Sequence, residues 1–163
     1  MNLKELFVLQ KELDNHISKE HNLYNKNLLS KKILALQVEL GELANETKCF
    51  KFWSNKKPSN KEIILEEYVD CLHFLLSIGL DKSFNDIEVI NPKNESTYEM
   101  ADYFLNLFVD INDFFVCSCK DQYITLFEDF LMLGNHLCFS EEDIKNAYIY
   151  RNKINHNRQI NVY

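Results

Sequence analysis

Glycine and proline are scarce in this chain, which has 3 Gly and 2 Pro among 163 residues. These turn-forming residues are too few for the turns that connect the strands of a many-stranded sheet, and their scarcity favours long helices. Hydrophobic residues make up 46% of the chain and aromatic residues 13%, which excludes disorder over most of its length. The length fits a single domain over residues 1–163 with a substantial core.

Positive charge is also in short supply, with 18 Lys and Arg against 25 Asp and Glu and a net charge of -7. This balance argues against a protein that coats nucleic acid, although local positive charge or a metal ion still permits a small anionic substrate. No apolar run approaches the length of a membrane span, and the first residues lack a signal-peptide pattern. The 5 cysteines form no CxxC pair, so we expect reduced, mostly packed thiols in a cytoplasmic protein.

Apolar periodicity predicts about six helices in a compact all-α bundle. Residues 81–95 show no helical period and are predicted to form a loop. Ser59 with Glu62 and Ser96 with Glu99 match the capping-box pattern that opens a helix. The predicted helices span about 3–19, 28–52, 59–79, 96–117, 122–136 and a final segment after residue 140.

Two clusters of acids are the clearest chemical signal. Glu39 and Glu42 are three residues apart, as are Glu67 and Asp70, so each pair shares one face of a helix. Two such helices facing one another would direct four carboxylates at one point. Oxygen ligands of this kind suit Mg²⁺, which binds a few carboxylates together with substrate phosphates.

The alternative for any acid pair is a solvated helix face, and the residues after Asp70 argue against it. They read CLHFLLSIG and carry no formal charge, and a helix that is apolar all round is usually buried. His73, Phe74 and Ser77 fall in the same sector as Glu67 and Asp70, which predicts an internal pocket. Buried carboxylates need a cation. On the preceding helix, Glu39, Glu42 and Glu46 flank the apolar stripe, as partners at the pocket rim should.

The wider sequence resembles the all-α nucleoside triphosphate pyrophosphatases and, within them, the dimeric dUTP diphosphatases. The resemblance rests on ExxE followed after 24 residues by ExxD, on FKFW at 50–53, on EEYVDCLHF at 66–74, and on AYxxRNxxNxxRQ at 147–159. It implies a four-helix catalytic core and a homodimer. It also implies two or more Mg²⁺ ions held by Glu39, Glu42, Glu67 and Asp70.

By the same resemblance, water attacks the α-phosphorus of dUTP and releases dUMP and pyrophosphate. Glu39 is the residue expected to orient or deprotonate this water, and Glu42 is the alternative. Arg151, Asn155 and Arg158 lie on one helical face, and Arg is well shaped for bidentate phosphate contacts. The phosphate-binding set is then Lys56, Arg151, Asn152, Asn155 and Arg158.

The resemblance also implies that the base binds residues of the first helix and residues at the positions that follow FKFW and ExxD. Gln10 offers both a donor and an acceptor to the edge of uracil, and an aromatic face can stack on the ring. The full predicted set is Gln10, Asp14, Trp53, His73 and Phe74.

Other functions stay open at this point. A related pyrophosphatase could act on dCTP or on several nucleotides, and cleavage of dUDP is undecided. A helical protein that acts only by binding partners is a further alternative. Cys117, Cys119, His136 and Cys138 fit no common zinc spacing, which favours ordinary packed residues.

Overall fold

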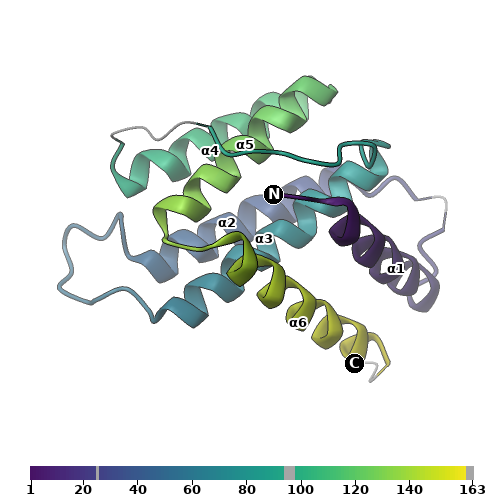
Figure 1. Ribbon diagram of the computed structural model, residues 1–163, viewed down its shortest axis with the longest axis horizontal. Helices are drawn as coiled ribbons and strands as arrows, with labels where there is room; N and C mark the ends of the chain where they lie inside the picture. The colour runs from purple at the N-terminus through teal and green to yellow at the C-terminus, as the bar shows by residue number, and fades with distance from the viewer. Residues whose placement is uncertain (25, 94–97, 161–163) are drawn as a thin grey trace.

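A computed structural model describes residues 1–24, 26–93 and 98–160, and within these ranges the protein is built from six α-helices (Figure 1). The described residues contain no strand, and the only strand-like pairing among them is an isolated bridge between Asn2 and Val89. The prediction of an all-α bundle is therefore confirmed. The helices are α1 (Lys4–Glu20), α2 (Leu29–Thr47), α3 (Lys61–Asp81), α4 (Met100–Val116), α5 (Lys120–His136) and α6 (Glu141–Ile160).

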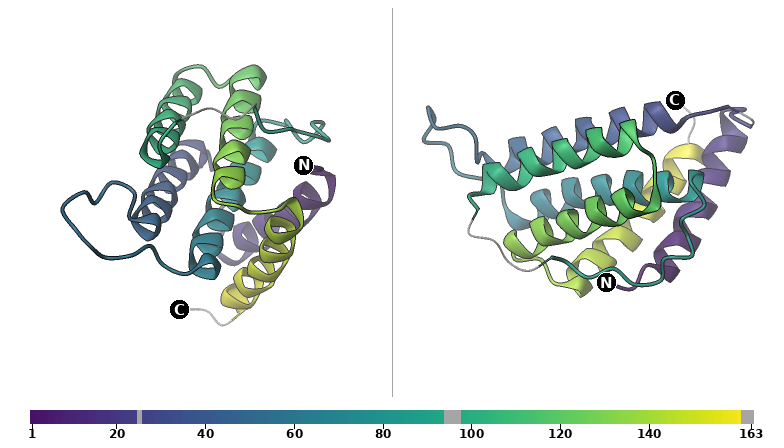
Figure 2. Two further views of the ribbon diagram at one scale, coloured as in Figure 1. Left: turned by 60° about the vertical axis from the view of Figure 1, so that its left-hand side comes forward. Right: turned by 90° about the horizontal axis from the view of Figure 1, so that it is seen from above.

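Helices α2 to α5 form a four-helix bundle, while α1 and α6 pack against each other and against α3 (Figure 2). Helix α3 contacts α1, α2, α5 and α6, so it has neighbours around most of its circumference. All residues of 71–79 except Phe74 are buried. The uncharged stretch after Asp70 is thus buried, as its composition predicts, because a helix segment that is apolar all round has no polar face to expose to water.

Two predicted helix ends are wrong at the connection between α2 and α3. Helix α2 ends at Thr47 rather than near residue 52, because Lys48 adopts a left-handed conformation with φ of 58°. The N-cap of α3 is Asn60, whose side chain accepts a hydrogen bond from the Ile63 amide at 3.0 Å. Ser59 does not cap the helix and instead donates its hydroxyl to Glu46. Glu46 therefore holds the connecting loop through this hydrogen bond, and it is not among the described residues that line the cavity beside the acids.

The start of α4 also differs from its prediction. Ser96 lies outside the described residues, and Glu99 is itself the N-cap, in a capping box with Asp102. The prediction placed Glu99 three residues inside the helix. Both patterns place an oxygen acceptor next to free amide groups, and spacing alone does not choose between them.

The cysteines are all free, as predicted, but most are not packed. Cys71 is buried in the core, whereas Cys117, Cys119 and Cys138 are exposed. These three lie at the two ends of α5 rather than on an inward face, and the ends of a helix are open to water even where its middle is buried.

Small residues let the central helices approach closely. A Cβ added at Gly134 on α5 would lie 2.5 Å from the hydroxyl of Tyr68 on α3, nearer than non-bonded atoms approach. The Tyr68 hydroxyl donates to the carbonyl of Phe130 at 3.0 Å, and its ring stacks on Phe130 with centroids 4.2 Å apart. This contact ties α3, which carries two of the candidate metal ligands, to the rest of the bundle.

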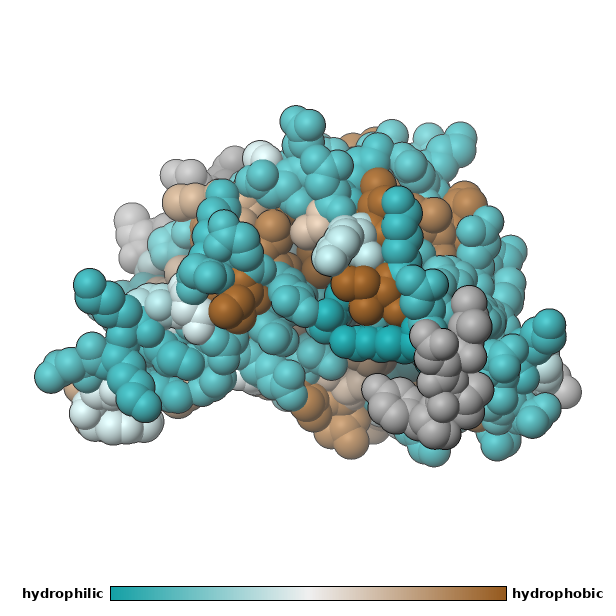
Figure 3. Space-filling view, turned by 90° about the horizontal axis from the view of Figure 1, so that it is seen from below, coloured by the Kyte–Doolittle hydropathy of each residue, from teal (hydrophilic) through white to brown (hydrophobic). Residues whose placement is uncertain are grey.

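The outer surface is mainly polar where the molecule is seen from below, with apolar residues showing in separate patches (Figure 3). Among the described residues, no helix is both long enough and apolar enough to cross a bilayer.

Candidate active site

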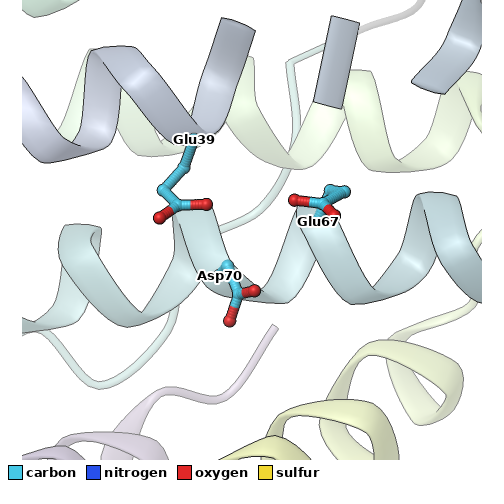
Figure 4. Close-up of side chains that lie close together, drawn as sticks. All are labelled: Glu39, Glu67 and Asp70. Carbon is cyan, nitrogen blue, oxygen red and sulfur yellow. The ribbon is translucent and has the colours of Figure 1, made fainter. Parts of the chain in front are cut away.

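Three of the four predicted acids come together between α2 and α3. Glu39 reaches from α2 towards Glu67 and Asp70 on α3 (Figure 4). One oxygen of each carboxylate lies within 4.8 Å of the others, and this is the only group of three or more candidate metal ligands found among the described residues. Glu42 is exposed and lies outside that group, but its charge still acts on Glu39 and Glu67.

The acids destabilise one another's charged forms. Burial, reinforced by the charges of Asp70, Glu42 and Glu67, raises the pKa of Glu39 to about 7. Burial and the neighbouring acids also raise the pKa of Glu67. Such shifts reflect carboxylates that lack enough positive charge around them. The cluster therefore has the electrostatic character of a cation site.

Arg151 on α6 is the positive side chain that contacts this cluster. Its Nε donates to Asp70 Oδ1 at 2.7 Å, its Nη2 donates to the other Asp70 oxygen, and its Nη1 donates to Glu66. The hydrogen bonds with Asp70 raise the pKa of Arg151. This bidentate geometry, which a lysine could not provide, brings the C-terminal helix to the acids of α3.

A cavity of about 440 Å³ opens beside the acids, between α1, α2, α3 and α6. Its volume is in the range of sites that bind small molecules. The predicted site residues that line it come from four helices, and they are Gln10, Asp14, Glu39, Asp70, His73, Phe74, Arg151, Asn155 and Arg158.

The polar end of this cavity is a connected set of hydrogen bonds. Gln10 donates from Nε2 to Asp14 Oδ1 at 2.8 Å, and Ser77 donates to Asp14 Oδ2 at 2.6 Å. Lys32 lies 3.7 Å from Asp14 and 2.7 Å from Asp81. Burial raises the pKa of Asp14, while Ser77 and Lys32 act in the opposite direction.

His73 is neutral in this environment. It is buried, and burial together with the charge of Arg151 lowers its pKa to about 3. Its Nδ1 lies 2.8 Å from Gln10 Oε1, while no described residue is a hydrogen-bond partner of its Nε2. The ring stacks on Tyr148 with centroids 4.3 Å apart.

Three predicted site residues lie elsewhere in the single chain. Trp53 and Lys56 are exposed on the loop that projects beyond the ends of α2 and α3 (Figure 1). Asn152 is buried against α1, where its amide donates to the Leu9 carbonyl at 3.5 Å. None of the three is among the described residues that line the cavity. Helix α2 ends at Thr47, so Trp53 lies in the connecting loop.

Sequence reasoning missed Lys32 and Tyr148. Lys32 precedes Glu39 by seven residues, which is two helical turns, so a search of the Glu39 face of α2 would have found it. Tyr148 is inside the C-terminal motif, but nothing in the sequence indicates that its hydroxyl reaches Gln10 on a helix more than 130 residues away.

The cysteines and the histidine whose spacing fits no common zinc pattern lie around the ends of α5. Cys117, Cys119, His136 and Cys138 belong to no group of three candidate ligands among the described residues.

Comparison with known proteins agrees with the site. A family model described as dUTPase matches residues 2–163 of the chain. The chain belongs to the dimeric all-α dUTPase family. None of the curated proteins compared with the chain matches it. Membership of the dUTPase family over the whole chain supports dUTP diphosphatase activity, and the predicted resemblance is confirmed. The dUTPase family is generally metal-dependent, and the acid cluster of Glu39, Glu67 and Asp70 offers carboxylate oxygens that could hold a metal ion.

Proposed function

We propose that this protein hydrolyses dUTP to dUMP and pyrophosphate with two or more Mg²⁺ ions. The observation that carries the proposal is the convergence of Glu39, Glu67 and Asp70 beside a cavity that also contains Arg151. Glu42 completes the proposed ligand set from the exposed edge of the same helix face. The reaction would remove dUTP from the nucleotide pool and would supply dUMP.

The residues present suit Mg²⁺. Their ligand atoms are all carboxylate oxygens, which Mg²⁺ prefers, and no thiol or imidazole belongs to the cluster. When bound, Mg²⁺ would neutralise the triphosphate and lower the pKa of a coordinated water. Arg151 alone does not balance the acids around it, since Glu39 and Glu67 both keep a raised pKa in its presence.

Glu39 is proposed to orient and deprotonate the water that attacks the α-phosphorus. The Glu39 carboxylate belongs to the acid cluster and also lines the cavity, so it lies where a general base could accept a proton from water. Arg151, Asn155 and Arg158 line the same cavity and are proposed to bind the phosphates through charge-assisted hydrogen bonds. Glu42 remains the alternative base.

The choice of uracil is supported by the order of donors and acceptors on the cavity wall. The Gln10 amide nitrogen can donate, a carboxylate oxygen of Asp14 can accept, and the Lys32 amino group can donate. All three residues line the cavity, and Gln10 and Lys32 each contact Asp14. Uracil presents the complementary order of acceptor, donor and acceptor, whereas cytosine places an amino group and an unprotonated ring nitrogen at two of these positions. Phe74 provides a partly buried aromatic face in the same cavity.

A second copy of the chain is the proposed partner. Leu34 and Val38 on α2 and Leu105 and Val109 on α4 are more than half exposed, and these two helices pack side by side. Their adjacent apolar faces suit burial against another helical surface, as in a two-fold symmetric dimer. Trp53 and Lys56, which lie outside the cavity of their own chain, are then available to the neighbouring site.

The deciding experiment measures pyrophosphate release from dUTP, dCTP, dTTP and UTP, each with Mg²⁺ and with EDTA. The expected result is a strong preference for dUTP and no release in EDTA. A preference for dCTP, or equal rates for all four, would overturn the assignment of the base. The same assay with dUDP, read as phosphate release, decides whether the diphosphate is also a substrate. A helical protein that only binds partners would release no pyrophosphate under any of these conditions.

A further inference from the structure

A buried hydrogen-bonded group connects α6, α1 and α3 behind the cavity. The Tyr148 hydroxyl lies 2.8 Å from Gln10 Oε1, and His73 Nδ1 lies 2.8 Å from the same oxygen. Tyr148 is fully buried and is not among the residues that line the cavity. Its hydroxyl also lies 3.4 Å from the Leu6 carbonyl, a longer contact. Tyr148 therefore acts on the cavity only through its neighbours.

The direction of each hydrogen bond follows from the protonation states. Burial lowers the pKa of His73 to about 3, so the ring is neutral near pH 7 and carries one N–H. Burial also raises the pKa of Tyr148, so its hydroxyl remains protonated. An amide oxygen can only accept. His73 therefore carries its proton on Nδ1, and both Tyr148 and His73 donate to Gln10.

This arrangement leaves the Gln10 amide one favourable orientation. Its oxygen accepts two hydrogen bonds, which occupies both lone pairs, and its nitrogen donates to Asp14 at 2.8 Å. A rotation by 180° would place the amide oxygen against the Asp14 carboxylate and the amide N–H₂ group against the N–H of His73. The donor that Gln10 presents to the cavity is therefore held by groups behind the cavity wall.

We propose that Tyr148 is a positioning residue for base selection, which keeps the Gln10 N–H₂ group and the His73 tautomer in the arrangement that accepts uracil. This inference rests on the proposed function of the cavity. Without the hydroxyl, Gln10 has a weaker preference between its two amide orientations, and one of them presents an acceptor where uracil also presents an acceptor. The selectivity for uracil then falls. Removal of the hydroxyl also removes its hydrogen bond with the buried Asn152 side chain, whereas the contacts of Arg151 and the acids of α2 and α3 do not involve Tyr148.

The test is Tyr148→Phe, which keeps the ring stacked on His73 and removes only the hydroxyl. The matched control is Tyr123→Phe, because Tyr123 is equally buried but donates to the Leu75 carbonyl, away from Gln10. For Tyr148→Phe we expect the KM for dUTP to rise about fivefold and the selectivity for dUTP over dCTP to fall about fivefold. We expect kcat to stay within about twofold of the wild-type value. Tyr123→Phe is expected to keep the wild-type selectivity.

Two further measurements separate positioning from a general structural effect. Nitrogen-15 NMR of the nucleotide-free protein should show His73 protonated on Nδ1 in the wild type and a second tautomer in Tyr148→Phe. In a Gln10→Met background, the Tyr148→Phe change should cause no further loss of selectivity, since residues that act through one another give non-additive effects.

Unchanged selectivity in Tyr148→Phe, or additive losses in the double variant, would overturn the inference. A wild-type enzyme without any preference for dUTP would instead contradict the proposed function. The tautomer measurement needs no nucleotide, so it tests the hydrogen-bonded group in either case.

Discussion

Arg151 donates hydrogen bonds from two guanidinium nitrogens to Asp70, so a proposed phosphate-binding residue is hydrogen-bonded to a proposed metal ligand. The two residues are 81 positions apart in the chain and lie on α6 and α3. A metal ion bound at the acids would compete with the Arg151 guanidinium for the Asp70 carboxylate, so we expect metal binding and the position of the C-terminal helix to be coupled.

Replacing Arg151 tests this coupling. In Arg151→Gln we expect tighter Mg²⁺ binding without nucleotide, measured by calorimetry, because Asp70 loses a competing cation. We also expect kcat/KM for dUTP to fall by about tenfold or more, because charge-assisted hydrogen bonds to phosphate are lost. The control is Arg158→Gln, which lies in the same cavity but is not bonded to an acid of the cluster. Weaker Mg²⁺ binding in Arg151→Gln would show instead that Arg151 orients Asp70 for the metal.

Replacing Glu39 tests the proposed metal site and base together. Glu39→Gln should reduce the rate of dUTP hydrolysis by at least about a hundredfold. It should also remove most of the thermal stabilisation that Mg²⁺ and a non-hydrolysable dUTP analogue give to the wild type. The control Glu62→Gln changes an exposed acid in the first turn of α3 and should leave both properties intact. Hydrolysis that survives in Glu39→Gln would move the role of base to Glu42.

A mixed dimer tests whether Trp53 serves the neighbouring site. We expect Glu39→Gln and Trp53→Ala each to be poorly active as pure dimers. A heterodimer isolated through two different tags contains one site in which Glu39 of one chain meets Trp53 of the other, so about half of the wild-type activity should return if sites are shared. A heterodimer that is no more active than the pure variants would place the role of Trp53 within its own chain, or outside the site. Val38→Lys should prevent dimer formation in analytical ultracentrifugation, whereas Val8→Lys on α1 should not.

The pair Asp110 and Asp129 predicts how stability depends on pH away from the active site. Burial, together with the hydrogen bond and charge of Asp129, raises the pKa of Asp110 to about 7, while Lys93 acts against this and Asp113 adds to it. The proton on Asp110 therefore stabilises the folded state fully below the ordinary pKa of 3.8, and this contribution is lost as pH rises to about 7.

Asp110→Asn keeps a hydrogen-bond donor beside Asp129 and cannot ionise. After discounting for solvent screening, it should be about 1 kcal/mol more stable than the wild type at pH 8 and little different at pH 4. Thermal melts at the two pH values measure this difference. The control Asp113→Asn replaces an exposed acid on the same helix and should leave the pH dependence almost unchanged. Equal melting curves for Asp110→Asn and the wild type at pH 8 would contradict the prediction.

Much of the fold and part of the site were predictable from local patterns. Apolar periodicity and the scarcity of glycine and proline identified six helices. The spacing of four acids, with the uncharged residues after Asp70, predicted one acid cluster, and three of the four form it while Glu42 lies outside. The predicted ends of α2 and α3 were wrong because one left-handed residue, Lys48, and the choice between Ser59 and Asn60 as cap depend on small local energy differences.

The sequence by itself determined the helical class and the faces that carry the acids, because these follow from residue types repeated at helical spacing. Its motifs also carried the resemblance to the family that the family model then confirmed. Only the tertiary structure decided which distant side chains meet. Arg151 meets Asp70, and Lys32 lies beside Asp14. Gln10 contacts both Tyr148 and His73. Trp53 is not among the described residues that line the cavity of its own chain. The angles at which helices cross and the points at which they end set such contacts, and neither is written in the spacing along one helix.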